Sequence, residues 1–447
     1  MRWQDKYRAK LITAEQAAAL VKPGDVVAFP LQLHPRAIAM ALAERREELH
    51  DVTLVGEWSE DHPWLQPGWG KTFIIKDVYG TRYTRQGLRE RWIDWVPWPF
   101  SFSSDISRQG QTGRSGACHG ADFFMFRVTP PNEDGYCSFG HSLFYTPSAV
   151  KSAKTAIALV DPSLIWTCGD YVHVSELDYL VEPVLKESIQ LSQYVPIPSK
   201  EEQGLADVIA AHIASLIHDG DTIQVGIGTS SEAIWQFLGD KNDLGLDTEI
   251  LVPETVELIK KGVFTGKRKN VNKEKVVCSA LMTWPHPSTP PALQFVDNNQ
   301  MFEFCDISYI ANVPRVASND NMVAINAVIA VDLIGQAVID SIGSVPLSGP
   351  GGQPEYLIGS HYSRGGRSIS TLNTTAKGGT VSRIVPQLDK GAMVAIPSFY
   401  MDYLVTEYGV VNLENKSRRE RAEAIISVAH PDFQSELRKA AKKLFWP

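Results

Sequence analysis

Two glycines in the C-terminal half of the sequence stand where backbone chemistry is possible. Gly226 and Gly228, with Ile227 between them, follow an apolar segment that is typical of a β-strand. A helical segment begins next, and Thr229 and Glu232 have the spacing of a capping box. Glycines at such a turn let the backbone approach a ligand, and free N–H groups there can bind an anion or a developing oxyanion. The alternative is an ordinary tight turn between a strand and a helix.

Glu249 places a carboxylate within the apolar segment 247–252, which the sequence predicts to be the next strand. In a parallel βαβ arrangement this strand neighbours the one before the glycine turn, and ligands bind beyond the carboxyl ends of such strands. We therefore expect Glu249 to lie close to the Gly226 turn. The alternative is an edge-strand glutamate that reaches solvent.

A second glycine cluster, residues 348–353, contains more glycine than a turn requires. Gly351 and Gly352 could bring further N–H groups to the same place, although Pro350 removes one N–H and restricts the residue before it. A flexible hairpin loop is the alternative.

Three cations near the polar segment 371–375 could contact phosphate groups, with exposed surface positions as the alternative for each. They are Lys377, Arg364 and Arg367.

The elements that position these residues occur twice in the chain. Residues 14–30 read as helix, turn and strand, and the same order returns within 205–252 at an offset of 196. Between residues 24 and 51 six identities align without a gap: Gly24 with Gly220, Asp25 with Asp221, Ala37 with Ala233, Ile38 with Ile234, Leu42 with Leu238 and Asp51 with Asp247. Two such units predict two α/β domains of similar topology, each an open, largely parallel sheet covered by helices. Chance similarity between ordinary α/β units is the alternative.

The copies differ where chemistry would be placed, because Thr53 stands in the first copy where Glu249 stands in the second. The Pro-rich, charged segment 194–203 predicts the boundary between the copies. We therefore expect an N-terminal domain over 1–195 and a C-terminal domain over 196–447.

Composition excludes several classes of function. The chain has 447 residues and a net charge of −8, without a basic block suited to nucleic acid. No apolar run approaches a membrane span, and the charged N-terminus lacks the apolar core of a secretory signal, so we expect a cytoplasmic protein. Its five cysteines are scattered without a CxxC pair, which argues against a disulfide framework and against a zinc site.

Several segments resemble, in order and spacing, family I coenzyme A transferases of the acetyl-CoA hydrolase and 4-hydroxybutyrate CoA-transferase branch. In the C-terminal half they are GIGTSSEAI, DTEILVPETVELIKKGVFTGKRK, MVAINAVIAVDLIGQAVIDSIGS, SGPGGQPEYLIGS, and the stretch from VSRIVP to VTEYGVVNLENKSRRERAEAIISVAHPDF. In the N-terminal half PPNEDGYCSFGHSLFYTPSAVKSAK and HVSELDYLVE look like the same branch. The resemblance covers nearly the whole chain and weakens between residues 56 and 125.

The resemblance implies that Glu249 is the catalytic glutamate, which carries CoA as a glutamyl-CoA thioester during transfer between carboxylic acids. It implies one oxyanion-type backbone donor in the loop 226–228, and a second at Gly351 or Gly352. The pocket loop of the family usually has a small aliphatic residue at the position of Pro350, so the loop shape and substrate choice here could differ.

The same resemblance implies that Asn326 and Glu407 line the site. It also implies two CoA-transferase-like domains with the active site at their interface, a homodimer, acyl-CoA and small carboxylates as substrates, and no metal or tightly bound cofactor. Hydrolysis of acyl-CoA by the same glutamate is the nearest alternative. A catalytically silent module that binds CoA or a metabolite, and a sugar-phosphate isomerase, are alternatives of other classes.

The region of weak resemblance is rich in tryptophan, with six of the eleven tryptophans between residues 58 and 98. These aromatic rings could shape an acyl pocket, and the alternative is core packing or a dimer interface. The Gly/Ser-rich segment 101–120 reads as a loop that could act as a lid.

Overall fold

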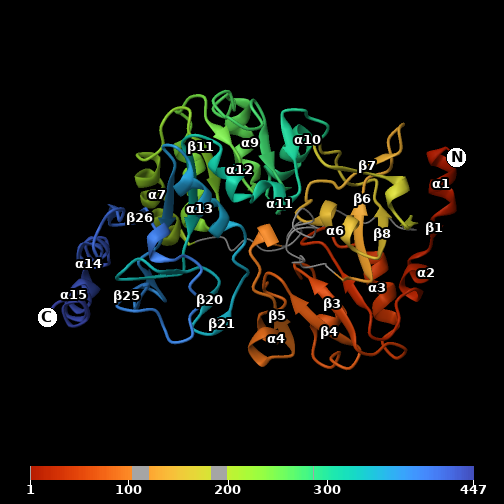
Figure 1. Ribbon diagram of the computed structural model, residues 1–447, viewed down its shortest axis with the longest axis horizontal. Helices are drawn as coiled ribbons and strands as arrows, with labels where there is room; N and C mark the ends of the chain where they lie inside the picture. Colours follow the sequence, from red (N-terminus) through yellow and green to blue (C-terminus); the bar gives the residue numbers. More distant parts are fainter. Residues whose placement is uncertain (1, 103–119, 183–198, 285) are drawn as a thin grey trace. The chain divides into compact units, whose positions relative to one another are not determined.

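Parallel strands dominate the computed structural model, which describes residues 2–102, 120–182, 199–284 and 286–447 (Figure 1). The described chain forms two structural units. The first unit holds the residues up to 182 together with Leu251–Pro253 and Val277–Ile310, and the second holds the others. Val277–Ile310, which we assigned to the C-terminal domain, thus packs within the first unit, and the division at residue 195 stays a prediction. Half of the expected boundary segment and most of the expected lid lie outside the described residues.

The first unit is built on an eight-stranded sheet in which every neighbouring pair is parallel. In spatial order its strands are β1 (Leu11–Ile12), β10 (Tyr179–Val181), β8 (Thr155–Val160), β6 (Phe123–Val128), β2 (Val26–Ala28), β3 (Val52–Gly56), β4 (Phe73–Asp77) and β5 (Ile93–Trp95). The helices of this unit include α1 (Trp3–Ala9), α2 (Ala14–Ala19), α3 (Arg36–Glu44), α4 (Arg85–Glu90), α6 (Thr146–Ser152), α10 (Thr289–Val296) and α11 (Ile307–Ile310).

The second unit contains a six-stranded sheet whose neighbouring pairs are parallel except the last. In spatial order its strands are β12 (Gly245–Leu246), β11 (Thr222–Val225), β17 (Met322–Ala327), β22 (Arg367–Thr371), β26 (Tyr403–Thr406) and β27 (Gly409–Asn412). Its helices include α7 (Lys200–Ala214), α8 (Thr229–Glu232), α12 (Val313–Ala317), α13 (Gln353–Tyr362), α14 (Arg418–Ser427) and α15 (Pro431–Phe445). The predicted fold class, with two open and largely parallel α/β sheets, is confirmed.

Short strands and 3₁₀ turns complete the described chain. The short strands are β7 (Tyr136–Ser138), β9 (Tyr171–His173), β13 (Ile250–Leu251), β14 (Val276–Cys278), β15 (Ala280–Leu281), β16 (Phe302–Phe304), β18 (Ala330–Asp332), β19 (Ala337–Val338), β20 (Ser341–Ile342), β21 (Val345–Pro346), β23 (Thr375–Ala376), β24 (Val381–Ser382) and β25 (Ile384–Val385). One further helix is α9 (Pro253–Lys260), and the 3₁₀ turns are η1 (Pro63–Leu65), η2 (Phe100–Phe102), η3 (Val174–Glu176), η4 (Ala233–Phe237) and η5 (Ser398–Tyr400). Within the described residues, no helix combines the length and the apolar character needed to cross a bilayer.

The two copies of the sequence repeat enter their sheets through the same turn. Gly24 and Gly220 have φ values of 84° and 86°, a conformation that glycine adopts without steric cost. Asp25 and Asp221, which follow them, each accept a hydrogen bond of 2.7 Å from the backbone N–H three residues earlier. The strands β2 and β11 begin directly after these turns. The repeat therefore corresponds to the same local structure in both units.

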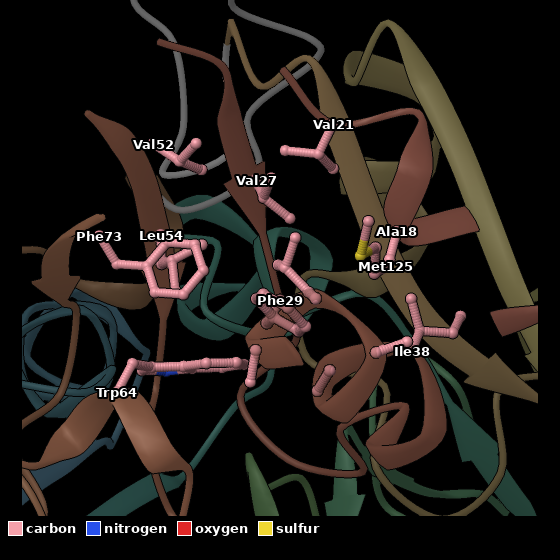
Figure 2. Packing of buried hydrophobic residues seen from close by; sticks show 14 of the residues in the cluster. Ala18, Val21, Val27, Phe29, Ile38, Val52, Leu54, Trp64, Phe73 and Met125 are labelled. Atoms are coloured by element: carbon pink, nitrogen blue, oxygen red, sulfur yellow. The ribbon is translucent and has the colours of Figure 1, made fainter. Parts of the chain in front are cut away.

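The tryptophan-rich segment supplies core residues of the first unit. Trp58 and Trp64 are fully buried, and Trp69, Trp92 and Trp95 pack partly buried against the same hydrophobic cluster. Figure 2 shows Trp64 in this cluster beside residues of the central strands. For these five residues the structure favours core packing over an acyl pocket.

Candidate active site

The sheet of the second unit has a switch point at β11. The chain continues from β11 to β12 on one side, whereas β17, β22 and β26 are added on the other side. Ligands of open α/β sheets bind at the carboxyl ends of the strands beside such a point. Gly226 follows β11 directly, and Asn326 is the penultimate residue of β17. Both therefore lie at the edge where a ligand is expected.

The backbone of the glycine loop offers two N–H groups. The N–H of Gly226 donates to Ile325 O at 2.8 Å and is thus used by the sheet. The N–H groups of Ile227 and Gly228 donate to no acceptor in the described part of the chain. Of the three loop residues, Ile227 and Gly228 are therefore the ones able to serve as anion donors.

The predicted capping box at Thr229 is wrong, because the N-cap of α8 is Gly228, whose φ is 152°. Thr229 is already helical, and the N-cap makes no side-chain capping bond. Ser231 holds the loop instead, since its hydroxyl donates to Gly226 O at 2.7 Å and to Gly228 O at 3.0 Å. The loop conformation is therefore fixed from inside the helix.

Asn326 is oriented by Gln224 on the neighbouring strand β11. Gln224 Nε2 donates to Asn326 Oδ1 at 3.1 Å, and Asn326 Nδ2 donates to Gln224 Oε1 at 2.8 Å. Both side chains are buried, so this reciprocal pair satisfies amide groups that water does not reach. A Cβ at Gly226 would stand 2.1 Å from Asn326 Oδ1. The first glycine therefore makes room for the asparagine.

Glu249 does not lie in a strand, which corrects the expectation for 247–252. β12 ends at Leu246, and β13 begins at Ile250. The N–H of Asp247 still donates to Ile223 O at 3.0 Å, in continuation of the parallel pairing with β11. Glu249 thus stands just beyond the carboxyl end of β12, the strand beside β11, as the parallel arrangement predicted.

The carboxylate of Glu249 is packed against the start of α13. It is 8% exposed, and a Cβ at Gly352, the N-cap of α13, would stand 1.7 Å from Glu249 Oε1. Only glycine leaves space for this carboxylate. Oε1 is buried and makes no hydrogen bond within the described part of the chain.

The surroundings of Glu249 favour its neutral form. Burial raises the pKa of Glu249 to about 8, and the negative charge of Glu355 adds to the rise, while the Gly352 N–H opposes it. Glu355 lies in the first turn of α13 and is itself buried. An acid of this pKa exchanges its proton near neutral pH, which is typical of functional carboxylates.

Glu407 follows β26 at the same edge of the sheet. Its carboxylate accepts hydrogen bonds from Thr374 N at 3.0 and 3.1 Å and from Thr374 Oγ1 at 2.6 Å. Thr371 closes β22, and its hydroxyl lies 2.9 Å from that of Ser230 in α8. The polar segment 371–375 is thus tied to Glu407 at one end and to the glycine-loop helix at the other.

The structure does not bring Arg364 and Arg367 to this edge. Arg367 opens β22 and pairs in register with Val323, four residues before the end of β17. Its guanidinium donates to Leu216 O and to Asp221, while Arg364 pairs with Asp320. Both cations thus lie toward the amino ends of the strands and have protein partners. Lys377 is exposed and follows β23.

Three residues of the site were missed by sequence reasoning. Gln224 orients Asn326, Glu355 acts on the charge of Glu249, and Tyr356 follows Glu355 in the first turn of α13. Gln224 carried a usable signal, because it is a polar residue inside an otherwise apolar strand. The other two lie in a helix whose approach to Glu249 no local pattern shows.

Two family models match the chain. Residues 1–187 match the family model of the acetyl-CoA hydrolase/transferase N-terminal domain, and residues 290–441 match that of the corresponding C-terminal domain. The crystal structure of RipA from Yersinia pestis is similar with a TM-score of 0.85 and 30% identity, covering 99% of both chains.

Two curated relatives match all or nearly all of the chain. The 4-hydroxybutyrate coenzyme A transferase of Clostridium kluyveri is 34% identical over 100% of both chains. The succinyl-CoA:cyclohexane-1-carboxylate CoA transferase of Geobacter metallireducens is 32% identical over 99% of this chain and 97% of its own length. The acetyl-CoA hydrolase of Kluyveromyces lactis is more distant, at 28% identity over 47% of this chain and 39% of its own. The chain therefore belongs to the acetyl-CoA hydrolase/transferase family and is a family I coenzyme A transferase.

Proposed function

We propose that this enzyme transfers CoA from an acyl-CoA to a carboxylic acid through a glutamyl-CoA thioester on Glu249. The observation that carries the proposal is the placement of the Glu249 carboxylate. It is buried beyond the end of β12, against the helix-capping glycine Gly352, and its Oε1 makes no hydrogen bond in the described chain. A buried carboxylate with one oxygen that has no hydrogen-bond partner in the described chain is available as a nucleophile.

The transfer proceeds through two pairs of acyl exchanges. A carboxylate oxygen of Glu249 attacks the thioester carbonyl of the donor, and the CoA thiolate leaves, which gives a mixed anhydride. The thiolate then attacks the Glu249 carbonyl of the anhydride and releases the donor acid, which leaves CoA bound as a thioester. The acceptor carboxylate attacks this thioester, and the released thiolate attacks the acyl carbon of the new anhydride. Glu249 is thereby regenerated without any net proton transfer.

Each tetrahedral intermediate needs donors for its negative oxygen. The N–H groups of Ile227 and Gly228 are available beyond β11, and that of Gly352 acts on the Glu249 carboxylate. One such donor is typically worth about 3 kcal/mol of the barrier. We assign Ile227 and Gly352 to these roles, with Gly228 and Gly351 shaping the loops and Asn326 and Glu407 lining the pocket. Lys377 remains the candidate contact for a CoA phosphate.

Burial makes the ionised carboxylate of Glu249 more reactive towards the uncharged thioester. A carboxylate whose pKa is raised to about 8 is a stronger nucleophile than a solvated one. When it becomes a thioester, it loses its charge and the repulsion from Glu355. The ionised ground state is thus disfavoured relative to the covalent intermediate.

The substrates we propose are acyl-CoA esters and small organic acids. The relatives named above act on 4-hydroxybutyrate and on cyclohexane-1-carboxylate, which are both small monocarboxylates. We also propose a cytoplasmic homodimer. The scattered cysteines, without a CxxC pair, support a reducing compartment.

Initial-rate kinetics with a donor and an acceptor test the proposal. Purified enzyme is assayed with acetyl-CoA or succinyl-CoA against 4-hydroxybutyrate, butyrate and cyclohexane-1-carboxylate. A covalent intermediate predicts parallel lines in double-reciprocal plots, because the first product leaves before the second substrate binds. Intersecting lines for every active pair would contradict the proposal. Release of CoA without an acceptor, at a rate comparable to transfer, would favour hydrolysis instead.

A further inference from the structure

A buried cluster of charged groups adjoins Glu249 in the chain. Asp247, two residues earlier, is fully buried and binds both arms of the Arg315 guanidinium at 2.9 and 2.7 Å. Lys269 lies 3.3 Å from the same carboxylate, and Asn319 donates to it at 3.5 Å. Burial alone would raise the pKa of Asp247, but the charges of Arg315 and Lys269 hold it below the usual range. The two cations therefore favour the ionised form of Asp247, which has partners on several elements.

Tyr356 connects this cluster to the helix that faces Glu249. Its hydroxyl donates to Asp247 Oδ1 at 3.3 Å, and its side chain is fully buried. Tyr356 lies in the first turn of α13, where its N–H donates to Gly352 O at 3.0 Å. Asp247 thus holds the turn whose N-cap touches Glu249.

Arg315 brings a second helix into the same arrangement. It lies in α12, which packs against α13. The two-armed contact of a guanidinium with a carboxylate fixes the relative orientation of both groups. A buried ion pair contributes little net stability compared with apolar packing, so its main effect is on geometry.

We propose that Tyr356, acting through Asp247 and Arg315, is a positioning residue that holds the N-terminus of α13 against Glu249. The cluster ties the segment 247–249 to α12 and α13, so the nucleophile and the Gly352 N–H keep their relative position. This inference rests on the proposed function of Glu249. Displacement of a reacting group by about 1 Å can slow catalysis about a hundredfold.

The test is Tyr356→Phe, which removes one hydroxyl and keeps the ring. We expect kcat to fall on the order of tenfold while KM changes less than about twofold, because positioning acts on the reaction and not on binding. A Gly352 N–H that is displaced from Glu249 no longer lowers the pKa of that carboxylate, so we expect the pH midpoint of the reaction to move to higher pH. Tyr362→Phe is the matched control on the same helix, where the side chain is exposed, and it keeps the wild-type kcat.

A double-mutant cycle separates positioning from a loss of stability. In an Asp247→Asn background, or in Lys269→Met if that variant does not fold, Tyr356→Phe has less effect on kcat than it has in wild type. Equal effects in both backgrounds, or an unchanged kcat in Tyr356→Phe, would overturn the inference.

Mass spectrometry of the wild type with acyl-CoA separates the two proposals. A wild type without a Glu249 thioester contradicts the proposed function, whereas a labelled wild type with normal Tyr356→Phe kinetics contradicts the positioning role alone.

Discussion

The two copies of the repeat show how one local structure serves packing in one unit and chemistry in the other. In the first copy the turn at Gly24 leads into β2, and the next strand, β3, runs unbroken over Val52–Gly56. In the second copy the turn at Gly220 leads into β11, but the next strand stops after Gly245–Leu246. Glu249 occupies the interruption, whereas its counterpart Thr53 pairs in register with β2 and β4. The carboxylate that we propose as the nucleophile thus lies where the strand is interrupted.

The copies also differ on the central strand. Ala28 ends β2, and its counterpart on β11 is Gln224, which pairs with Asn326 of the neighbouring strand. Pro30 follows β2 where Gly226 follows β11. At these positions the second copy therefore has the glutamine of an amide pair and a glycine, whereas the first copy has an alanine and a proline.

Replacement of Glu249, which follows the interrupted strand, should have the largest effect on kcat. Glu249→Gln is expected to lower kcat by at least about a thousandfold, because the amide cannot attack a thioester. Thr53→Ala, at the equivalent position of the first copy, is expected to stay within twofold of wild type. Steady-state transfer rates of the two purified variants check the comparison. A Glu249→Gln enzyme with more than a tenth of the wild-type kcat would contradict the assigned difference between Glu249 and Thr53.

Closing the space at the start of α13 should have the next largest effect. Gly352→Ala places a Cβ 1.7 Å from the original position of Glu249 Oε1, so the nucleophile and its donor must separate. We expect kcat to fall about a hundredfold. Gly204→Ala in α7 is the control, because a Cβ there meets nothing within 4 Å. If both variants retain wild-type rates, the contact between Gly352 and Glu249 does not matter for catalysis.

Replacement of Gln224 on β11 by alanine, the residue of the first copy, should have a smaller effect on kcat. Gln224→Ala leaves the Asn326 amide buried without its partner, which costs about 1–3 kcal/mol of unfolding free energy. We expect kcat to fall on the order of tenfold as Asn326 loses its orientation. Denaturant unfolding and steady-state kinetics measure the two quantities. The double variant Gln224→Leu with Asn326→Leu should regain stability without regaining activity, and recovery of both would show that the pair only supports packing.

Removal of the negative charge of Glu355 should have the smallest effect, and this effect should be on the pH dependence of the reaction. The reactive form is the carboxylate, so kcat/KM should rise with pH and be half-maximal near pH 8, the pKa of Glu249. Glu355 raises that pKa, so Glu355→Gln should move the midpoint to lower pH. Glu257→Gln, at an exposed position of α9, should leave the midpoint in place. An unshifted profile in Glu355→Gln would remove Glu355 from the account.

Local patterns in the sequence predicted the framework of both units. Glycine turns followed by apolar runs located β2 and β11, because both the turn and the strand depend on neighbouring residues. The parallel βαβ arrangement then predicted Glu249 close to the glycine loop, since parallel strands end at a common edge. The cluster 348–353 indicated Gly352, and the family resemblance added Asn326 and Glu407.

Features that depend on distant residues were not predicted. The segment 247–252 reads as a strand, but Asp247 is bound by Arg315 from another helix, and the strand stops before that contact. Arg364 and Arg367 lie at the amino end of β22, which cation identity alone does not reveal. The tryptophans pack in a core that gathers strands from across the first unit.

Trapping of the intermediate tests the central claim most directly. Enzyme is incubated with acetyl-CoA or succinyl-CoA, treated with borohydride and digested, and the peptide that contains Glu249 is examined by mass spectrometry. A glutamyl-CoA thioester predicts reduction of the Glu249 side chain to the alcohol, and no such change in Glu249→Gln. An unmodified Glu249 in an enzyme that transfers CoA from the same donor would contradict the account.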